Sequence, residues 1–99
     1  MIFFEWDESK ARINERKHGV RFDEAVLVFD DPFALFLQDR VEGGEIRWQA
    51  IGRSSALMVV LVAHAIREQD TDEVIRIISA RRATRKERTR YEQSREENA

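Results

Sequence analysis

The chain has 99 residues, 42% of them hydrophobic and 36% charged, and its formal net charge is −2. This length predicts a single small domain (residues 1–99) with a modest core. Cysteine is absent, which excludes disulfides and cysteine-based metal sites and fits a cytoplasmic protein. The N-terminal segment lacks the basic lead of a secretory signal, and the longest apolar run, 56–66, is too short to cross a membrane.

Charge is unevenly distributed along the chain. Residues 1–50 carry 7 basic and 11 acidic side chains, a net of −4, whereas residues 51–99 carry 10 and 8, a net of +2. Between 76 and 90 there are 7 basic residues against one acid, a local net of +6. Local fields govern the encounter with a polyanion, so this segment is a candidate for binding RNA.

The N-terminal third is predicted to form one strand and two helices. Alternating apolar residues indicate a strand at 2–6, and a mostly polar helix follows at 8–18. Asp7 is suited to cap this helix, and Gly19 can end it in the left-handed conformation. A second helix with an apolar stripe follows and ends at the Asp-Asp-Pro sequence 30–32, because proline disfavours a helical residue before it.

The remainder alternates as an antiparallel sheet does. Strands are predicted at 33–37, 45–51, 57–66 and 73–80, separated by turns at 39–44, 52–55 and 67–72. The third of these strands is nearly all apolar, as expected of a central strand covered on both faces. A C-terminal helix is predicted at 82–93, and residues 94–99 are expected to fray.

The order of these elements, β-α-α-β-β-β-β-α, predicts an α+β fold. We expect two N-terminal helices packed on a twisted antiparallel β-sheet, followed by a C-terminal helix, with the helices on one face and the other face partly open. If the last turn is tight, His64 lies opposite Arg76 on a shared face, with Arg67 near the start of the final strand. Basic side chains on the open face would form a working surface.

Familiar catalytic motifs are missing. Gly43-Gly44 has neither the spacing nor the lysine of a phosphate-binding loop, and the serines lack a nucleophile elbow. His18 and His64 are not at a metal-ligand spacing, and the two acids before Pro32 are expected to form a turn. No metal or other cofactor is therefore predicted.

Basic side chains remain as candidates for chemistry on RNA. The 2′-hydroxyl of RNA can attack the adjacent phosphate if a base removes its proton, a cation stabilises the phosphorane and an acid protonates the leaving oxygen. The side chains available for these roles are Lys17, His18, His64, Arg67, Arg76, Arg81 and Tyr91. Structural alternatives stay open: the basic segment 76–90 can be a solvated helix face, Arg76 can pair with an acid on a neighbouring strand, His18 can serve the helix dipole, and His64 can be a core histidine.

Short blocks in a fixed order form a wider pattern. They are Trp6-Asp7, Lys10, Asn14, Lys17 to Val20, Phe22 to Phe29, Asp31-Pro32, Arg47, Ile51-Gly52, His64 to Arg67, Ile75 to Arg81, Ala83-Thr84, Glu87-Arg88 and Tyr91-Glu92. Together they cover nearly the whole chain, and they resemble the BrnT family of toxins.

The resemblance implies a RelE-like toxin of a type II toxin–antitoxin system, an endoribonuclease that cleaves RNA without a metal and halts translation and growth. It implies a cognate ribbon-helix-helix antitoxin that neutralises the toxin and supplies the DNA binding, in a complex expected to be a heterotetramer. Carried over by position, the catalytic candidates are Arg67, Arg81, His18 and Lys17, and the RNA-binding candidates are Arg76, Arg47, His64 and Arg53. The alternative hypothesis is a non-catalytic nucleic-acid-binding or partner-binding module that acts in operon autoregulation.

Overall fold

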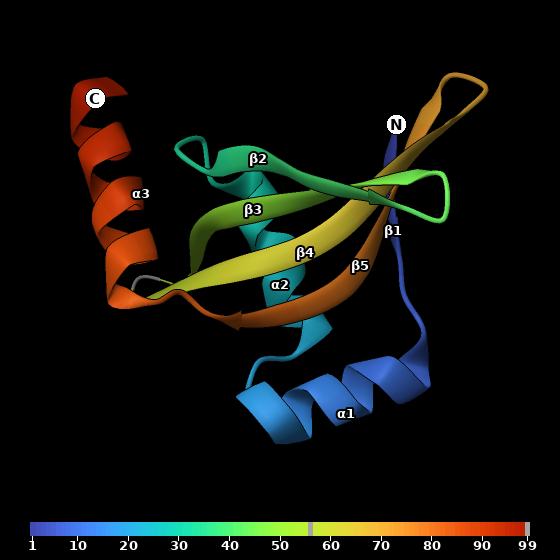
Figure 1. Cartoon of the computed structure of the whole chain (residues 1–99), viewed down its shortest axis with the longest axis horizontal. Helices are drawn as coiled ribbons and strands as arrows, with labels where there is room; N and C mark the ends of the chain where they lie inside the picture. Colours follow the sequence, from blue (N-terminus) through green and yellow to red (C-terminus); the bar gives the residue numbers. More distant parts are fainter. Residues whose placement is uncertain (56, 99) are drawn as a thin grey trace.

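The computed structural model describes residues 1–55 and 57–98. Within them, five strands form one sheet in the order β1-β5-β4-β3-β2 (Figure 1). The elements are β1 (Ile2–Glu5), α1 (Glu8–His18), α2 (Phe22–Val26), the 3-10 helix η1 (Leu27–Asp30), β2 (Leu35–Glu42), β3 (Glu45–Ser55), β4 (Met58–Gln69), β5 (Asp72–Arg82) and α3 (Arg85–Asn98). The α+β class and the order of the elements are confirmed.

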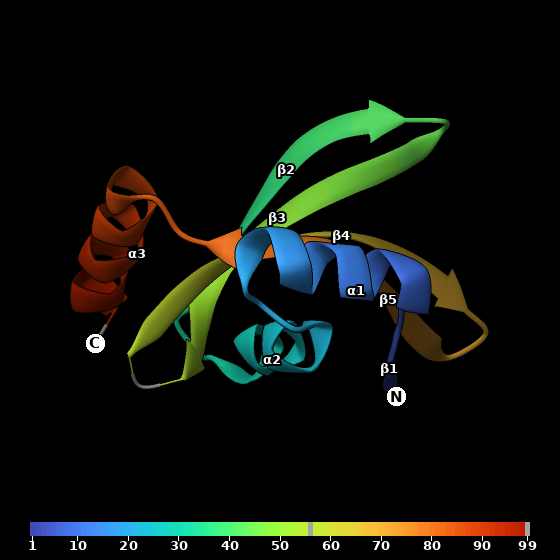
Figure 2. The ribbon, with the colours of Figure 1, turned by 90° about the horizontal axis from the view of Figure 1, so that it is seen from below.

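The sheet is mixed rather than antiparallel throughout. β1 pairs with β5 in parallel, with Ile2 opposite Glu73 and Glu5 opposite Arg76, whereas the other strand pairs are antiparallel. The expectation of an antiparallel sheet is wrong at this edge, because the first strand pairs with the last one in the chain instead of with a sequence neighbour. Figure 2 shows the β2–β3 and β4–β5 hairpins diverging, with α3 beyond the opposite end of the sheet.

Several boundaries differ from the prediction. The turn expected at 52–55 is strand, because β3 continues to Ser55 before the chain reverses. The turn expected at 39–44 is shorter, since β2 reaches Glu42 and only Gly43 and Gly44 take the positive φ angles of 60° and 77°. Helix α3 extends to Asn98, so the fraying expected over 94–98 is not observed. Residue 99 lies outside the described residues.

Helix α1 has the predicted ends. The Asp7 side chain accepts a hydrogen bond from the Lys10 backbone N at 3.0 Å, and Gly19 ends the helix at φ 71°. The buried Asn14 side chain then fastens this helix to the free edge of β5. Its Oδ1 accepts from the Ala80 N at 3.1 Å, while its Nδ2 donates to the Ala80 O at 2.8 Å and to the Val20 O at 3.0 Å. One amide thus replaces the neighbouring strand that β5 lacks there.

The two faces of the sheet pack against different helices. The first, here called the covered face, is buried by α1, α2 and η1. Its core consists of Val20, Phe22, Ala25, Val28, Ala50, Val60, Val62, Ile75, Ile77 and Ala80. The second, here called the arginine face, is turned toward the viewer in Figure 1, with α2 behind the strands. Only one end of it is covered, where Tyr91 of α3 packs on Ile51 and Leu61. The expectation that all helices share one face is therefore wrong for α3.

A β-bulge decides which side chains share a face. Ala63 pairs with Ser79, but His64 pairs with Ile77, so β5 contains one extra residue at this point. An extra residue reverses the alternation of side chains along a strand. On the turn side of the bulge, the hairpin register that pairs Gln69 with Asp72 places His64 opposite Ile77 on the covered face and Arg76 opposite Ala65 on the arginine face. Beyond the bulge, the extra residue brings Arg81 onto the arginine face as well. The prediction that His64 and Arg76 share a face is wrong.

Candidate active site on the arginine face

Five arginines from the three central strands project from the arginine face. The register places Arg47 opposite Ala65, and Ala65 opposite Arg76; Arg53, Arg67 and Arg81 lie opposite Val59, Val74 and Leu61. Directly paired residues point to the same side of a sheet. Between the arginines lie the small side chains Ala63, Ala65 and Ser79, together with Gln49, which pairs with Ala63. Small side chains leave room above the strands for a ligand.

One end of this face, here called the hairpin end, lies toward the turns of the β2–β3 and β4–β5 hairpins. There, each of three arginines contacts a carboxylate. Arg67 pairs with Glu5 of β1, and Arg76 pairs with Glu45 of β3. The Nε of Arg47 lies 3.4 Å from the same Glu45 oxygen. Arg76 therefore forms an ion pair within the sheet, as the structural alternative expected, but the acid lies on β3, two strands away, and not on a neighbouring strand. All three arginines keep solvent access, with 23% to 53% of their side-chain surface exposed, so a phosphate can still reach them.

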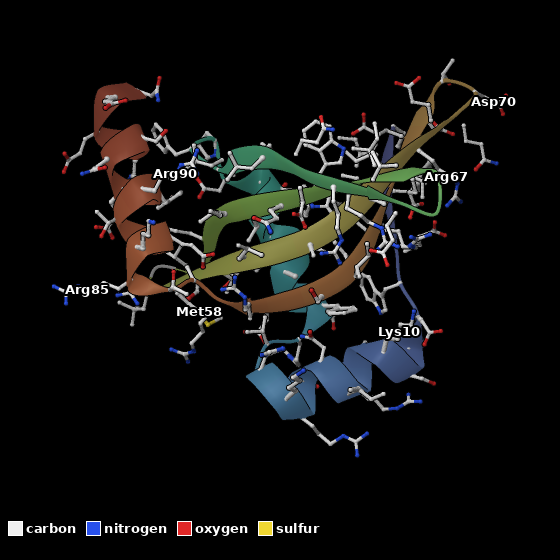
Figure 3. The ribbon with its side chains drawn as sticks, viewed as in Figure 1. Lys10, Met58, Arg67, Asp70, Arg85 and Arg90 are labelled. Atoms are coloured by element: carbon white, nitrogen blue, oxygen red, sulfur yellow. The ribbon has the colours of Figure 1, made fainter. Side chains whose placement is uncertain are left out.

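At the opposite end, Arg81 is held by helix α3. Its Nη1 and Nη2 donate to the two Glu87 oxygens at 2.8 Å and 3.0 Å. Glu87 also accepts from the Thr84 backbone N at 2.8 Å, and its own N donates to the Thr84 hydroxyl at 3.2 Å, which completes a capping box. The hydrogen bonds from Arg81 lower the pKa of Glu87 to about 2. Arg81 therefore connects the end of β5 to the start of α3. Figure 3 shows this helix, with Arg85 and Arg90, at the end of the sheet far from Arg67.

Beneath α3, Asp31 is a structural acceptor. Its Oδ2 accepts from the Tyr91 hydroxyl at 2.5 Å and from the Arg53 backbone N at 2.9 Å, and its Oδ1 accepts from the Phe33 N at 2.9 Å. Burial alone would raise the pKa of Asp31, but these hydrogen bonds lower it. Burial and the bond to Asp31 raise the pKa of Tyr91 to about 12. Tyr91 has no exposed surface, so it is not placed to donate a proton to RNA.

Arg53 lies at the end of the sheet that helix α3 covers. Arg53 stands near the end of β3 on the arginine face, and with Glu92, Arg95 and Glu96 of α3 it lines a hollow. Its Nε is buried and has no hydrogen-bond partner among the residues that the structure describes. Arg53 is thus at the α3 end with Arg81, and apart from the group formed by Arg47, Arg67 and Arg76.

His64 is a core histidine. It has no exposed surface, its Nδ1 lies 3.1 Å from the Val62 carbonyl oxygen, and the rings of Phe29 and Phe36 meet it edge-on at 4.9 Å and 6.3 Å. Burial lowers the pKa of His64 and favours the neutral ring. A side chain with no exposed surface on the covered face cannot contact RNA, so the RNA-binding prediction for His64 is not supported by its position.

Lys17 and His18 occupy the last turn of α1. Their end of the helix lies beside the end of β5 in both views (Figures 1 and 2). Within residues 1–55 and 57–98, no hydrogen bond or ion pair connects either side chain to the sheet arginines. The structure thus brings Arg47, Arg67 and Arg76 together, with Arg53 and Arg81 on the same face, and leaves Lys17 and His18 at its border.

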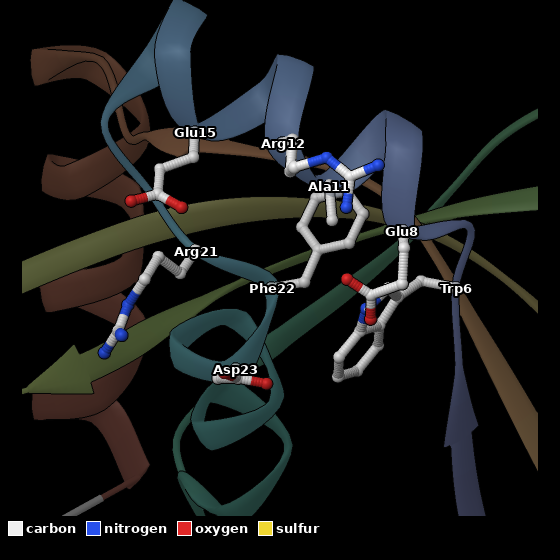
Figure 4. Close-up of a pocket in the computed structure, with 8 residues that line it drawn as sticks. All are labelled: Trp6, Glu8, Ala11, Arg12, Glu15, Arg21, Phe22 and Asp23. Carbon is white, nitrogen blue, oxygen red and sulfur yellow. The ribbon is translucent and has the colours of Figure 1, made fainter.

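A separate hollow of about 110 Å³ lies between α1 and α2 (Figure 4). It is lined by Trp6, Glu8, Ala11, Arg12, Glu15, Arg21, Phe22 and Asp23, none of which is a predicted site residue.

In the part of the chain that the structure describes, no three His, Asp or Glu side chains gather as a metal site would require. None of the described helices is long and apolar enough to span a membrane.

The acidic members of the site were not foreseen from the sequence. Glu45 stands two residues before Arg47, and this spacing puts both on one face of a strand. Thr84 and Glu87 have the spacing of a capping box, which predicts the start of α3 at Arg85 instead of at residue 82. Both signals are local. The pairing of Glu5 with Arg67 depends on the parallel placement of β1 and has no local signal.

The fold and this face define a class: a small α+β domain with an open, arginine-bearing sheet suited to a polyanion such as RNA. Comparison with known proteins identifies the family. The family model described as "Ribonuclease toxin, BrnT, of type II toxin-antitoxin system" matches residues 6–87. The chain therefore belongs to the BrnT family of ribonuclease toxins, as its sequence pattern indicated.

A solved structure agrees with this assignment. The chain is similar to the Brucella abortus ribonuclease toxin BrnT, with a TM-score of 0.64 and 26% sequence identity over 86% of this chain and 99% of that chain. A search among curated proteins gives no match.

Proposed function

We propose that this protein is a metal-independent endoribonuclease toxin that cleaves RNA on the arginine face and thereby halts translation and growth in the cytoplasm. The observation that carries the proposal is the convergence of Arg47, Arg67 and Arg76, from three strands, around the small side chains Ala63 and Ala65. Guanidinium groups hold phosphates through pairs of hydrogen bonds. They also stabilise the extra negative charge of a phosphorane, which is the electrostatic part of RNA cleavage.

The predicted site residues have different roles in this function. Arg67, Arg76 and Arg47 bind the RNA backbone, and their carboxylate partners leave when phosphates replace them. Arg81 and Arg53 stay candidates at the α3 end, but both terminal nitrogens of Arg81 already donate hydrogen bonds to Glu87. Proton transfer by His18 or Lys17 stays a prediction, supported by the position of their helix end beside β5.

We further propose a ribbon-helix-helix antitoxin as the partner, in a heterotetramer that binds DNA only through the antitoxin. Membership of a type II toxin–antitoxin family implies an antitoxin. Apolar side chains near the β2–β3 hairpin support a protein partner, because Val41 is 62% exposed, Ile46 45% and Ile66 37%. Neighbouring exposed apolar side chains of this kind often mark protein interfaces.

The test compares two double variants on a labelled RNA in buffer with EDTA. We expect the wild-type protein to cleave, and the Arg47→Ala/Arg76→Ala protein to cleave at least about 100-fold more slowly, since each lost donor to a transition-state charge costs about that much. The matched control, Arg88→Ala/Arg90→Ala, removes the same charge from exposed positions on α3 and should cleave at the wild-type rate. Expression of each protein without antitoxin should arrest growth in the same order.

The alternative hypothesis gives a different result in the same assay. A non-catalytic binding module would bind RNA with a steep salt dependence and leave it intact. Wild-type protein that arrests growth without producing RNA fragments, or that needs a divalent metal for cleavage, would contradict the proposal.

A further inference from the structure

Glu45 occupies a distinctive position on the arginine face. It begins β3, directly after the Gly43-Gly44 turn, and it lies two residues before Arg47 on the same side of the strand. One of its oxygens contacts the guanidinium groups of both Arg47 and Arg76, although Arg76 belongs to β5, two strands away. The small Ala65 lies between these arginines in the register, which lets the three side chains meet above the sheet.

The other carboxylates of this face have different surroundings. Glu5 lies on the outer strand β1 and contacts Arg67 of β4. Glu87 is committed to structure, since it accepts from both Arg81 nitrogens and from the Thr84 backbone N. Glu45, by contrast, has one third of its side-chain surface exposed and receives its contacts from the two arginines proposed to bind phosphate.

This arrangement places a proton acceptor beside a phosphate site. When an RNA phosphate takes the place of the carboxylate on Arg47 and Arg76, the Glu45 side chain remains adjacent to that phosphate. The 2′-hydroxyl that attacks a phosphate is carried by the neighbouring ribose, so the nucleophile and the displaced carboxylate come close together. An ionised carboxylate only accepts hydrogen bonds, and it is a suitable general base if it can reach the hydroxyl proton.

We propose that Glu45 is the general base of RNA cleavage in this protein. In this step, the Glu45 carboxylate takes the proton of the 2′-hydroxyl, and the 2′-oxygen forms a bond to phosphorus. The bond from phosphorus to the 5′-oxygen breaks, and the leaving oxygen takes a proton from water. The products are a 2′,3′-cyclic phosphate and a 5′-hydroxyl end, with no change of oxidation state. Arg47 and Arg76 stabilise the phosphorane. This inference rests on the proposed ribonuclease function and assigns to Glu45 the first of the two proton transfers.

The experiment uses the full chain with Glu45→Gln, which keeps the shape of the side chain and removes the base. Single-turnover cleavage of a labelled RNA is measured near neutral pH, and binding is measured with the same RNA carrying 2′-O-methyl ribose throughout, which lacks the attacking hydroxyl. We expect the variant to bind at least as tightly as the wild-type protein, because a negative charge leaves the phosphate site. Its cleavage rate should fall by about 100-fold or more, the usual contribution of a general base.

Two further variants identify the cause of any loss. Glu42→Gln is the matched control, because Glu42 lies opposite Glu45 in the β2–β3 pair but contacts only Arg40 among the described residues, at 3.0 Å. This control should cleave at the wild-type rate. Glu45→Asp keeps the charge with a shorter reach, and we expect a cleavage rate between those of the wild-type protein and Glu45→Gln.

The outcomes separate this inference from the proposed function. If the wild-type protein cleaves RNA and Glu45→Gln binds more tightly but cleaves within tenfold of it, Glu45 is an electrostatic competitor and not the base. If Glu45→Gln loses its thermal transition, the Glu45→Asp rate decides the question instead: a wild-type rate overturns the inference and an intermediate rate supports it. If the wild-type protein does not cleave at all, the proposed function fails first.

Discussion

The two faces of the sheet are built from the same strands but differ in chemistry. The covered face is apolar, and its histidine, His64, is buried without a partner for Nε2. The arginine face carries guanidinium groups that stay partly exposed and that contact carboxylates instead of apolar neighbours. Burying an unpaired charge is costly, so arginines in an otherwise apolar strand must lie where water, an acid or a ligand can reach them. The covered face therefore supplies stability, and the arginine face is free to bind a polyanion.

The arginine face itself divides into two ends. At the α3 end, Arg81 and Glu87 form a fork-like pair that is part of a helix cap. At the hairpin end, Arg47 and Arg76 share Glu45, and no helix of the described chain covers them. Side chains at the first end should matter for folding, and those at the second end for RNA. Four substitutions test the comparison between the two faces and between these two ends, in order of their expected effect on the free energy of unfolding.

The largest effect is expected for Asn14→Ala. Asn14 makes three buried hydrogen bonds, two of them to the Ala80 backbone at the edge of β5. Its removal takes the side-chain partner from one backbone N–H and two backbone C=O groups, and we expect a loss of about 3 kcal/mol. Urea unfolding followed by circular dichroism measures this loss. The folded fraction should still bind RNA normally; a loss of under about 0.5 kcal/mol would show that water replaces the amide.

Arg81→Ala should lower stability by about 2 kcal/mol, because it leaves the partly buried Glu87 carboxylate without its fork-like partner. The pKa of Glu87 is lowered from 4.5 to about 2, so the stabilisation is present above pH 4.5 and is lost as the pH falls towards 2. The difference between wild-type and variant stability should therefore shrink over that range. The rate of RNA cleavage should fall less than tenfold. A loss of about 100-fold in an equally stable protein would show that Arg81 is a catalytic residue.

His64 gives the covered face a pH dependence. Burial lowers its pKa below 6.5 in the folded protein, so stability is present above pH 6.5 and is lost as the pH falls below that value. The slope should reach at most about 1.4 kcal/mol per pH unit. His64→Leu should remove this slope. Equal slopes for wild-type protein and His64→Leu would show that His64 does not titrate during unfolding.

Much of the fold could be predicted because its signals are local. Asp7 and Gly19 mark both ends of α1 by capping chemistry, and the predicted bounds of that helix are the observed ones. Gly52 misled the prediction, because glycine in a strand usually indicates a turn. Here it lies within β3, where a Cβ would stand 2.9 Å from Val28 Cγ1 and 3.1 Å from Ala34 Cβ. The glycine therefore serves a close approach between η1 and the sheet.

The site could be predicted only in part. That Arg76 needs a partner follows from its apolar strand, but the identity of that partner does not, because Glu45 is 31 residues away in sequence. The face of His64 relative to Arg76 depends on the register of the β4–β5 hairpin, in which Gln69 pairs with Asp72, and a shift of one residue in that register reverses which side chains share a face. The edge that β1 joins depends on the whole sheet. Long-range pairing of this kind has no counterpart in local periodicity.

The smallest effect on stability is expected for Arg67→Ala, at the open end of the arginine face. Its ion pair with Glu5 is about half exposed, and exposed pairs contribute little, so the free energy of unfolding should change by less than about 0.5 kcal/mol. If Arg67 binds a phosphate, RNA affinity should fall. The slope of log affinity against log salt concentration should then decrease in magnitude by about 1, the contribution of one phosphate contact. The matched control is Arg40→Ala, whose pair with Glu42 is also exposed and which should leave the slope unchanged. An unchanged slope in Arg67→Ala, or an equal change in both variants, would remove Arg67 from the RNA-binding surface and restrict that surface to Arg47 and Arg76.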